Sequence, residues 1–138
     1  MSAPHFLGKV SLRAIVVQHG KVLIARDVND VDTWEIPGGR LDEGETVAEG
    51  MMRELKEELG IEVPIGPMIY SEQFHQTRDG SLHLMLTSEV VVDPGMELKF
   101  TLQPTEVAEV KWIDRSEFGQ YKLYDNCERA LKAYWNLT

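Results

Sequence analysis

Three glutamates, Glu54, Glu57 and Glu58, stand close together in the segment 46–59, which has helical periodicity. At ~100° per residue, their side chains fall within roughly 100° of arc on the helix surface. Like charges at these spacings weaken an isolated helix by about 0.2–0.5 kcal/mol per pair. A bound divalent cation offsets that repulsion, since Mg²⁺ prefers oxygen ligands. The alternative is a solvated helix face paired with Arg53 and Lys56, which is the more usual meaning of such a charge run.

The loop before this helix favours the cation site. Its Pro37-Gly38-Gly39 sequence allows a tight approach of the backbone, and a glycine carbonyl can serve as a ligand with no side chain in its way. Glu45 and Arg53 are eight residues apart and would lie on nearly the same face of a helix. We therefore expect a Glu45–Arg53 ion pair that ties the loop to the helix.

Length and composition limit the possible classes of protein. The 138 residues fit one domain, 1–138, with a single core. The net charge of −9 argues against general binding to a nucleic-acid backbone, which relies on Lys and Arg contacts. No apolar run approaches the ~20 residues of a membrane helix, and the first residues lack the pattern of a signal peptide. The single cysteine, Cys127, cannot form an internal disulfide. These features predict a cytoplasmic protein without membrane contact.

The elements that must position the glutamates follow from hydrophobic periodicity. Residues 27–45 are rich in Asp, Gly and Glu and predict a loop. The helix that follows has a buried stripe and ends at Gly60, a typical C-cap. Its stripe consists of Val47, Met51, Leu55 and Leu59.

The rest of the chain alternates strands with short connections. Strands are predicted at 9–18, 21–26, 68–76, 81–92 and 106–113. A helical turn is expected at 114–119 and a helix at 126–135, where Asp125 and Glu128 have the spacing of a capping box. The order of these elements predicts an α/β protein with a mixed sheet between helices.

The segment GRLDEGETVAEGMMRELKEELGI, residues 39–61, resembles the Nudix box, G-x5-E-x7-R-E-U-x-E-E-x-G-U, where U is a bulky aliphatic residue. It agrees with the box at every fixed position, which makes the signal highly specific. The resemblance implies a Nudix-type α/β/α sandwich and Mg²⁺-dependent hydrolysis of a nucleoside diphosphate linked to a further group, with Mn²⁺ as a possible substitute.

The resemblance also implies roles for individual residues. Glu54, Glu57 and Glu58 would be metal ligands together with the Gly39 carbonyl. Arg53 and Glu45 would be the orienting pair of the catalytic helix. The family often adds a glutamate from outside the box as a ligand or general base. Glu57, Glu106 and Glu109 are the candidates for the base, and Glu109 is preferred outside the box because it directly precedes the segment 110–112.

Contacts to the substrate are expected from Arg26, Arg40 and Asn126. The two arginines flank the loop in the family's layout and suit phosphates, but surface arginines are an equal alternative. Asn126 lies near the place where related enzymes read the base, and an amide can pair with a base edge. The alternative for Asn126 is an ordinary residue at the start of the last helix.

The substrate is expected to be a small molecule of nucleotide type. A nucleoside triphosphate, giving a nucleoside monophosphate and pyrophosphate, is preferred because proline or tyrosine markers of other family substrates are missing from the stretch around residues 76–78. Nucleotide sugars, dinucleoside polyphosphates and RNA 5′ ends are alternatives, as is a catalytically silent ligand-sensing module. A monomer and a homodimer are both compatible with the sequence.

Overall fold

The computed structural model describes residues 3–137. Within them the chain forms a sheet, two α-helices and one short 3₁₀ helix, η1. The elements are β1 (Lys9–Gln18), β2 (Lys21–Asp27), β3 (Trp34–Glu35), β4 (Gly38–Arg40), α1 (Val47–Leu59), β5 (Met68–His75), β6 (Leu82–Val91), β7 (Val107–Ile113), η1 (Arg115–Gln120) and α2 (Asp125–Tyr134).

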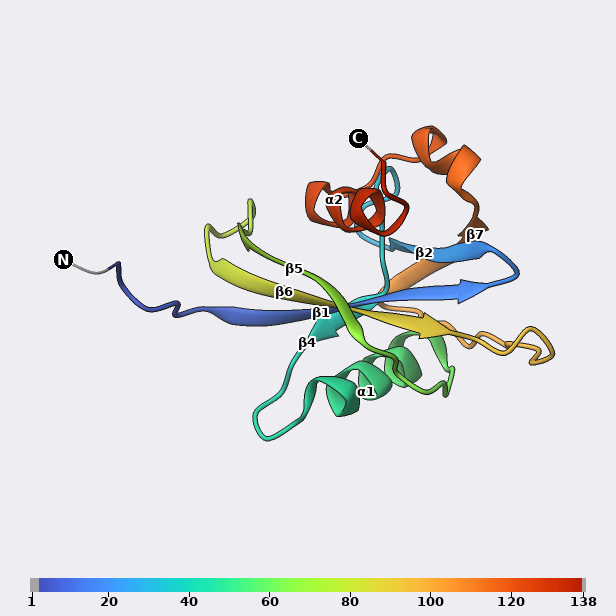
Figure 1. The fold of residues 1–138 in the computed structure, drawn as a ribbon, viewed down its shortest axis with the longest axis horizontal. Coiled ribbons are helices and arrows are strands. Elements are labelled where there is room, and N and C mark those ends of the chain that lie inside the picture. The colour runs from blue at the N-terminus through green and yellow to red at the C-terminus, as the bar shows by residue number, and fades with distance from the viewer. Residues whose placement is uncertain (1–2, 138) are drawn as a thin grey trace.

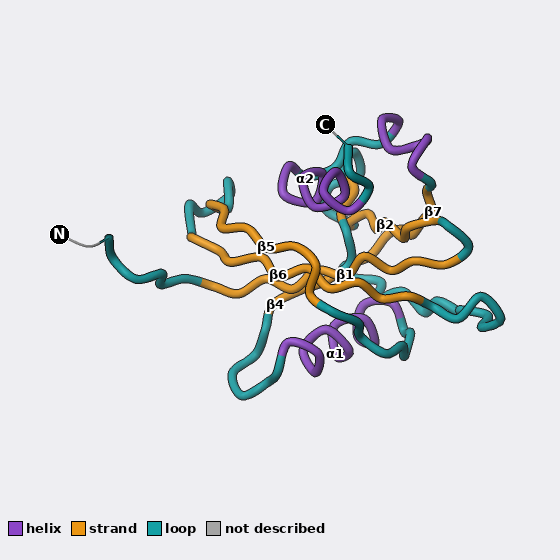
Figure 2. Tube along the Cα trace, in the orientation of Figure 1, coloured by secondary structure: helices purple, strands orange, loops and turns teal. Residues whose placement is uncertain are grey.

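The sheet is mixed and is built around β1. Its strand order is β3-β2-β1-β6-β5, with β4 added to β1 and β7 added to β2. The β1 and β6 strands run parallel, whereas β1 pairs antiparallel with β2 at one end and with β4 at the other. Helix α1 covers one face of this sheet and α2 covers the opposite face (Figures 1 and 2). The predicted α/β/α sandwich is therefore confirmed.

Alternation along β1 divides the core into two halves. Leu12, Ala14 and Val16 face α1, whereas Ile15 belongs to the cluster on the α2 side with Cys127. The sheet thus holds the two helices on either side of one central strand, and residues near Leu12 lie between them.

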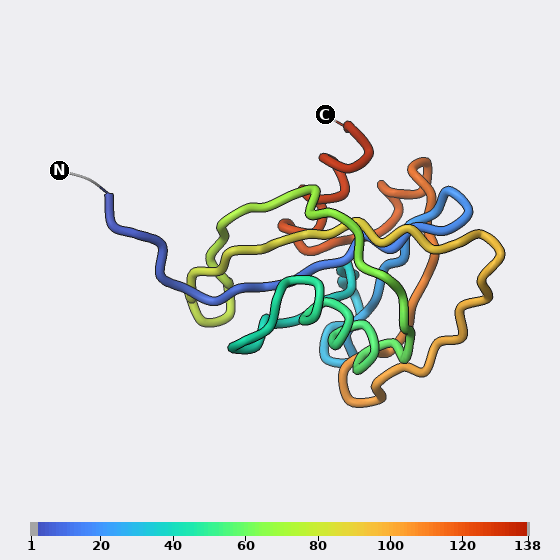
Figure 3. Tube along the Cα trace, turned by 60° about the horizontal axis from the view of Figure 1, so that its bottom comes forward, coloured from blue at the N-terminus to red at the C-terminus, as the bar shows by residue number. Residues whose placement is uncertain are grey.

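Helix α1 is fixed at both ends. Thr46 and Glu49 form a capping box, in which Thr46 Oγ1 accepts from the Glu49 N–H at 3.1 Å. Gly60 ends the helix with φ at 70°, the left-handed region that favours glycine, as the sequence predicted. Beyond β6, the long connection to β7 passes this C-terminus, where the Gln103 N–H donates to the Glu58 carbonyl at 2.8 Å (Figure 3). The connection thereby brings the start of β7 beside the last turn of α1.

Loss of the cap should loosen the start of this helix. We expect Thr46→Ala to lower the free energy of unfolding by about 1 kcal/mol, because an N–H in the first turn loses its side-chain acceptor. Urea denaturation followed by circular dichroism measures the change. Thr77→Ala is the matched control, since Thr77 is exposed in a turn. Equal stability of the two variants would contradict the capping role.

Two sequence-based predictions are wrong in detail. The segment 27–45 is not one loop, because β3 and β4 lie within it. Glycine-rich residues are poor strand formers, but β1 leaves room beside it where it separates from β2, and β4 pairs there with Ser11–Arg13. The capping box at Asp125 is absent: Tyr124 precedes α2 without a side-chain cap, and Asp125 is already the first helical residue.

The other predicted elements are present, with bounds that differ by one or two residues. The proposed domain, 1–138, extends slightly beyond the described residues and stays a prediction. Between residues 3 and 137 no helix combines the length and the apolar composition that a membrane crossing requires.

Candidate active site

Arg53 connects the loop to helix α1 and neutralises several carboxylates. Its Nε lies 2.7 Å from Glu45 Oε2, and its Nη2 donates to Glu45 Oε1 at 2.9 Å, so the predicted ion pair is confirmed. The same guanidinium contacts Glu54 at 2.8 Å and Glu57 at 3.2 Å. Its Nη2 also donates to the Arg40 carbonyl at 2.8 Å. The hydrogen bonds from Arg53 hold the pKa of Glu45 below its usual value.

Gly39 lies directly against the carboxylate of Glu54. A Cβ built at this position would overlap Glu54 Oε2, so any side chain here would displace the carboxylate. Glu54 itself is only 9% exposed, and burial raises its pKa even though Arg53 opposes the shift. Because Gly39 has no side chain, the backbone of the loop can lie in direct contact with the buried carboxylate of Glu54.

Glu58 lies one helical turn beyond Glu54 on α1, and other carboxylates act on it there. Burial, followed by the negative charges of Glu54 and Glu35, raises the pKa of Glu58 to about 8, although Arg13 opposes the shift. Glu106 also raises the pKa of both Glu54 and Glu58. Charges on α1, on β3 and just before β7 thus act on one another at this end of α1.

The donor set fits a hard divalent cation. The possible ligand atoms here are carboxylate oxygens and the Gly39 carbonyl, and oxygen is the ligand atom that Mg²⁺ and Mn²⁺ accept. Among residues 3–137, no three acidic or histidine side chains already converge closely enough to hold a metal. The reason is visible in the contacts of Glu54 and Glu57, which are both turned toward Arg53. A cation would offset the repulsion that raises the pKa of Glu58.

Glu106 and Glu109 lie in different surroundings. The pairing of β2 with β7 skips Ala108, since Arg26 lies opposite Glu109 and Asp27 lies opposite Val107. Glu109 is held by Arg26 at 3.2 Å, and its side chain is 48% exposed. Glu106, just before β7, is the one whose charge acts on Glu54 and Glu58. The structure thus brings Glu106, rather than Glu109, toward the glutamates of α1.

The three predicted substrate contacts also lie in different surroundings. Arg26 is occupied by Glu109 and lies over the ring of Trp34 at 5.8 Å. Arg40 is exposed beside the glycine loop, with its carbonyl bound by Arg53. Asn126 is 9% exposed, and its Oδ1 accepts from the Cys127 N–H at 2.9 Å, as expected of a residue in the first turn of a helix.

The model of the NUDIX domain matches residues 9–134. The chain belongs to the Nudix family. It is 33% identical over 113 residues to the CTP pyrophosphohydrolase of Escherichia coli, covering 80% of this chain and 78% of that protein. It is 30% identical over 122 residues to a putative 8-oxo-dGTP diphosphatase of Bacillus subtilis, covering 88% and 76%. It spans 44% of a further relative, Nudix hydrolase 2 of Arabidopsis thaliana.

Solved structures agree with this assignment. The solution structure of the E. coli ORF135 protein is 25% identical and superimposes with a TM-score of 0.76, covering 93% of this chain and 89% of that one. The E. coli dihydroneopterin triphosphate pyrophosphohydrolase superimposes with a TM-score of 0.75 at 20% identity, covering 91% and 93%, which shows the shared fold. The prediction of a Nudix-type enzyme is confirmed at the level of the family.

Two charged residues near the Nudix glutamates were missed by sequence reasoning. Glu35 and Arg13 lie 3.5 Å apart, and both act on the pKa of Glu58. Arg13 had a recognisable signal, because it is the one charged residue between positions 10 and 18 of a strand that is otherwise almost apolar. Its place beside the glycine loop depends on the pairing of β1 with β4, which the sequence pattern did not predict.

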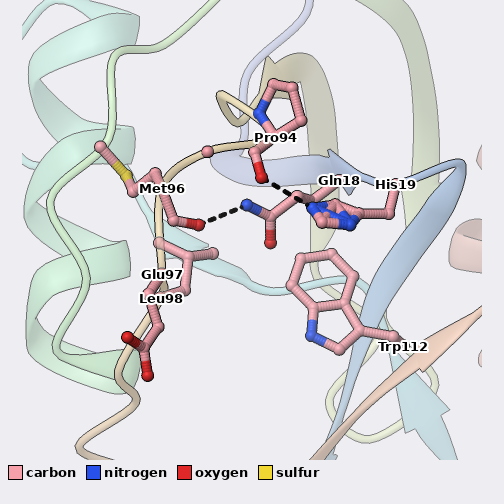
Figure 4. Close-up of a pocket in the computed structure, with 8 residues that line it drawn as sticks. Gln18, His19, Pro94, Met96, Glu97, Leu98 and Trp112 are labelled. Atoms are coloured by element: carbon pink, nitrogen blue, oxygen red, sulfur yellow. Dashed lines mark hydrogen bonds between the residues drawn. The ribbon is translucent and has the colours of Figure 1, made fainter.

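A surface cavity of about 380 Å³ includes no residue of α1 in its lining. It is lined by Gln18, His19, Trp112 and the loop 94–98 (Figure 4). Gln18 Nε2 donates to the Met96 carbonyl at 2.7 Å, which holds this loop over the end of β1. Gln18 is five residues beyond Arg13, or about 16 Å along an extended strand. The cavity is therefore a separate feature of the opposite end of β1.

Proposed function

We propose that this chain hydrolyses a nucleoside triphosphate, in a Mg²⁺-dependent reaction, to a nucleoside monophosphate and pyrophosphate. The observation that carries the proposal is the complete Nudix box, in which Arg53 already joins Glu45, Glu54 and Glu57 beside Gly39. Glu54, Glu57, Glu58 and the Gly39 carbonyl are the proposed metal ligands. Bound Mg²⁺ would offset the charge of the phosphates and lower the pKa of a water.

The protein side chains supply orientation and proton transfer. Arg53 and Glu45 keep the loop and the helix in register, as the positioning pair. A carboxylate accepts a proton from the attacking water, which then forms a bond to phosphorus while the bond to the leaving phosphate oxygen breaks. Because Glu109 is engaged by Arg26, we assign this role to Glu106, with Glu57 as the alternative within the box.

The class of substrate rests on the relatives as well as on the site. The E. coli relative is named a CTP pyrophosphohydrolase, and the B. subtilis relative a putative 8-oxo-dGTP diphosphatase. Both names describe nucleoside triphosphates, which supports that class over nucleotide sugars, dinucleoside polyphosphates and RNA 5′ ends. Location in the cytoplasm, and the choice between a monomer and a homodimer, stay predictions.

A release screen for phosphate and pyrophosphate tests the substrate class. Wild-type protein is incubated with Mg²⁺ and nucleoside triphosphates, nucleotide sugars or dinucleoside polyphosphates. We expect the highest kcat/KM with a nucleoside triphosphate and no turnover after chelation of the metal. A marked preference for a nucleotide sugar would refute the proposed substrate, and the absence of turnover in the whole screen would favour a silent ligand-sensing module.

A further inference from the structure

Arg13 stands in the middle of β1 at the point where the glycine loop joins the sheet. Its neighbour across one side of the strand is Gly38, next to Gly39, and its neighbour across the other side is Thr87 in β6. Its side chain belongs to the α2 face, because Ile15, two residues further, packs in the α2 cluster with Cys127. Arg13 therefore lies between the metal helix and the second layer of the sandwich.

The contacts of Arg13 leave part of its guanidinium free. Nη1 donates to the Ile36 carbonyl at 2.8 Å and lies 3.5 Å from Glu35 Oε2. Nε is buried and has no hydrogen-bond partner among the described residues, and the same holds for Thr87 Oγ1 on the neighbouring strand. Buried polar atoms nearly always have a partner, so an unpartnered arginine nitrogen points to a group that is bound there.

Among residues 3–137, Arg13 has one ion-pair partner, and that contact is long. Glu35 offsets the charge of Arg13 only at 3.5 Å, which is longer than the 2.7–2.9 Å of a strong charged hydrogen bond. Its positive charge reaches the Nudix helix, where it acts on Glu58. A planar guanidinium at this junction suits an anion that extends from the α2 side toward the proposed metal site. Arginine binds phosphate, as it binds carboxylate, by two parallel hydrogen bonds.

We propose that Arg13 binds the phosphate of the substrate that is nearest to the nucleoside, and so positions it against the metal helix. The inference rests on the proposed function, since it names a residue for the same site. The nucleoside would lie on the α2 side of Arg13, near Asn126 in the first turn of α2, and the remaining phosphates would extend toward Glu54 and Glu58. In this account Glu35 holds the guanidinium in place rather than serving as its sole counter-ion.

The decisive variant is Arg13→Met, compared with Arg129→Met as a matched control. Arg129 is also on the α2 side, but Glu72 already satisfies it with contacts of 2.8 and 3.1 Å. Calorimetry measures the affinity for a nucleoside monophosphate and for the bare nucleoside, using the base that the screen selects, and kinetics gives kcat/KM for the triphosphate. We expect Arg13→Met to lower monophosphate affinity and kcat/KM by about 30-fold, the equivalent of a charged hydrogen bond.

Nucleoside affinity should stay within about twofold of wild type in Arg13→Met, and every value within about twofold in Arg129→Met. Equal losses for nucleoside and monophosphate would overturn the proposal, because Arg13 would then only shape the pocket. Unchanged monophosphate affinity would overturn it as well. If Arg13→Met does not fold, Arg13→Lys carries the test: it keeps the charge but loses the planar fork, so we expect about a fivefold loss, and wild-type affinity would refute the role.

The two proposals fail in different ways. If wild-type protein hydrolyses a triphosphate and Arg13→Met does so equally well, only the assignment of Arg13 is wrong. If wild-type protein hydrolyses no triphosphate but binds the monophosphate more tightly than Arg13→Met does, the phosphate contact holds and the proposed reaction fails.

Discussion

Glu57→Gln should lower kcat for triphosphate hydrolysis in Mg²⁺ by about 1,000-fold, the scale of losing a group that stabilises charge in the transition state. Glu57 is the most exposed of the three glutamates Glu54, Glu57 and Glu58 on α1, with a side chain that is 59% exposed. Among residues 3–137 its carboxylate makes one ion pair, with Arg53 at 3.2 Å, so the amide should leave the fold intact. A loss of activity without a loss of stability would therefore report on the site itself.

Glu62→Gln is the control for this variant. Glu62 is also an exposed glutamate near the end of α1, and it pairs with Lys56 at 2.9 Å, but it lies outside the proposed ligand set. Its kcat should match that of wild type. Steady-state release of pyrophosphate measures both variants, with thermal unfolding as the check on folding. Undiminished hydrolysis by Glu57→Gln of every substrate that wild type cleaves would show that the metal helix is wrongly assigned.

Glu106→Gln should reduce kcat by about 100-fold, as expected for loss of a general base. Glu109→Gln should stay within about threefold of wild type, because its carboxylate is committed to Arg26 on the surface of β7. The pair is well matched, since the two residues are three positions apart and each change removes one negative charge. Single-turnover measurements of the chemical step compare them.

The opposite ranking of these two variants would restore Glu109 as the catalytic glutamate. Equal and small effects would move the base into the box, to Glu57. Each result thus selects one of the three candidates that the sequence left open.

Much of the fold followed from the sequence because its elements are locally consistent. The apolar run of β1 indicated a strand. The apolar stripe of α1 has the periodicity of a helix, and Gly60 marked the end of that helix. The Glu45–Arg53 ion pair was also accessible, because both residues lie at fixed positions relative to one helix. Local geometry was sufficient in these cases.

Features that depend on distant segments were not accessible. The β4 strand exists because β1 leaves its edge open beside Gly38 and Gly39, and no local propensity favours a strand there. The position of Glu106 depends on the connection that hydrogen-bonds to the end of α1 and on the irregular pairing at Ala108. Arg13 acquired its neighbours from β4 and β6, whose register no pattern within β1 can specify.

The most direct test of the central claim is ³¹P NMR of wild-type protein acting on the preferred nucleoside triphosphate. Spectra with Mg²⁺ and with excess chelator would show which phosphorus–oxygen bond breaks and whether the metal is required. We predict nucleoside monophosphate and pyrophosphate as the only products, with no reaction in the chelated sample. Formation of nucleoside diphosphate and inorganic phosphate, or equal turnover without Mg²⁺, would contradict the account.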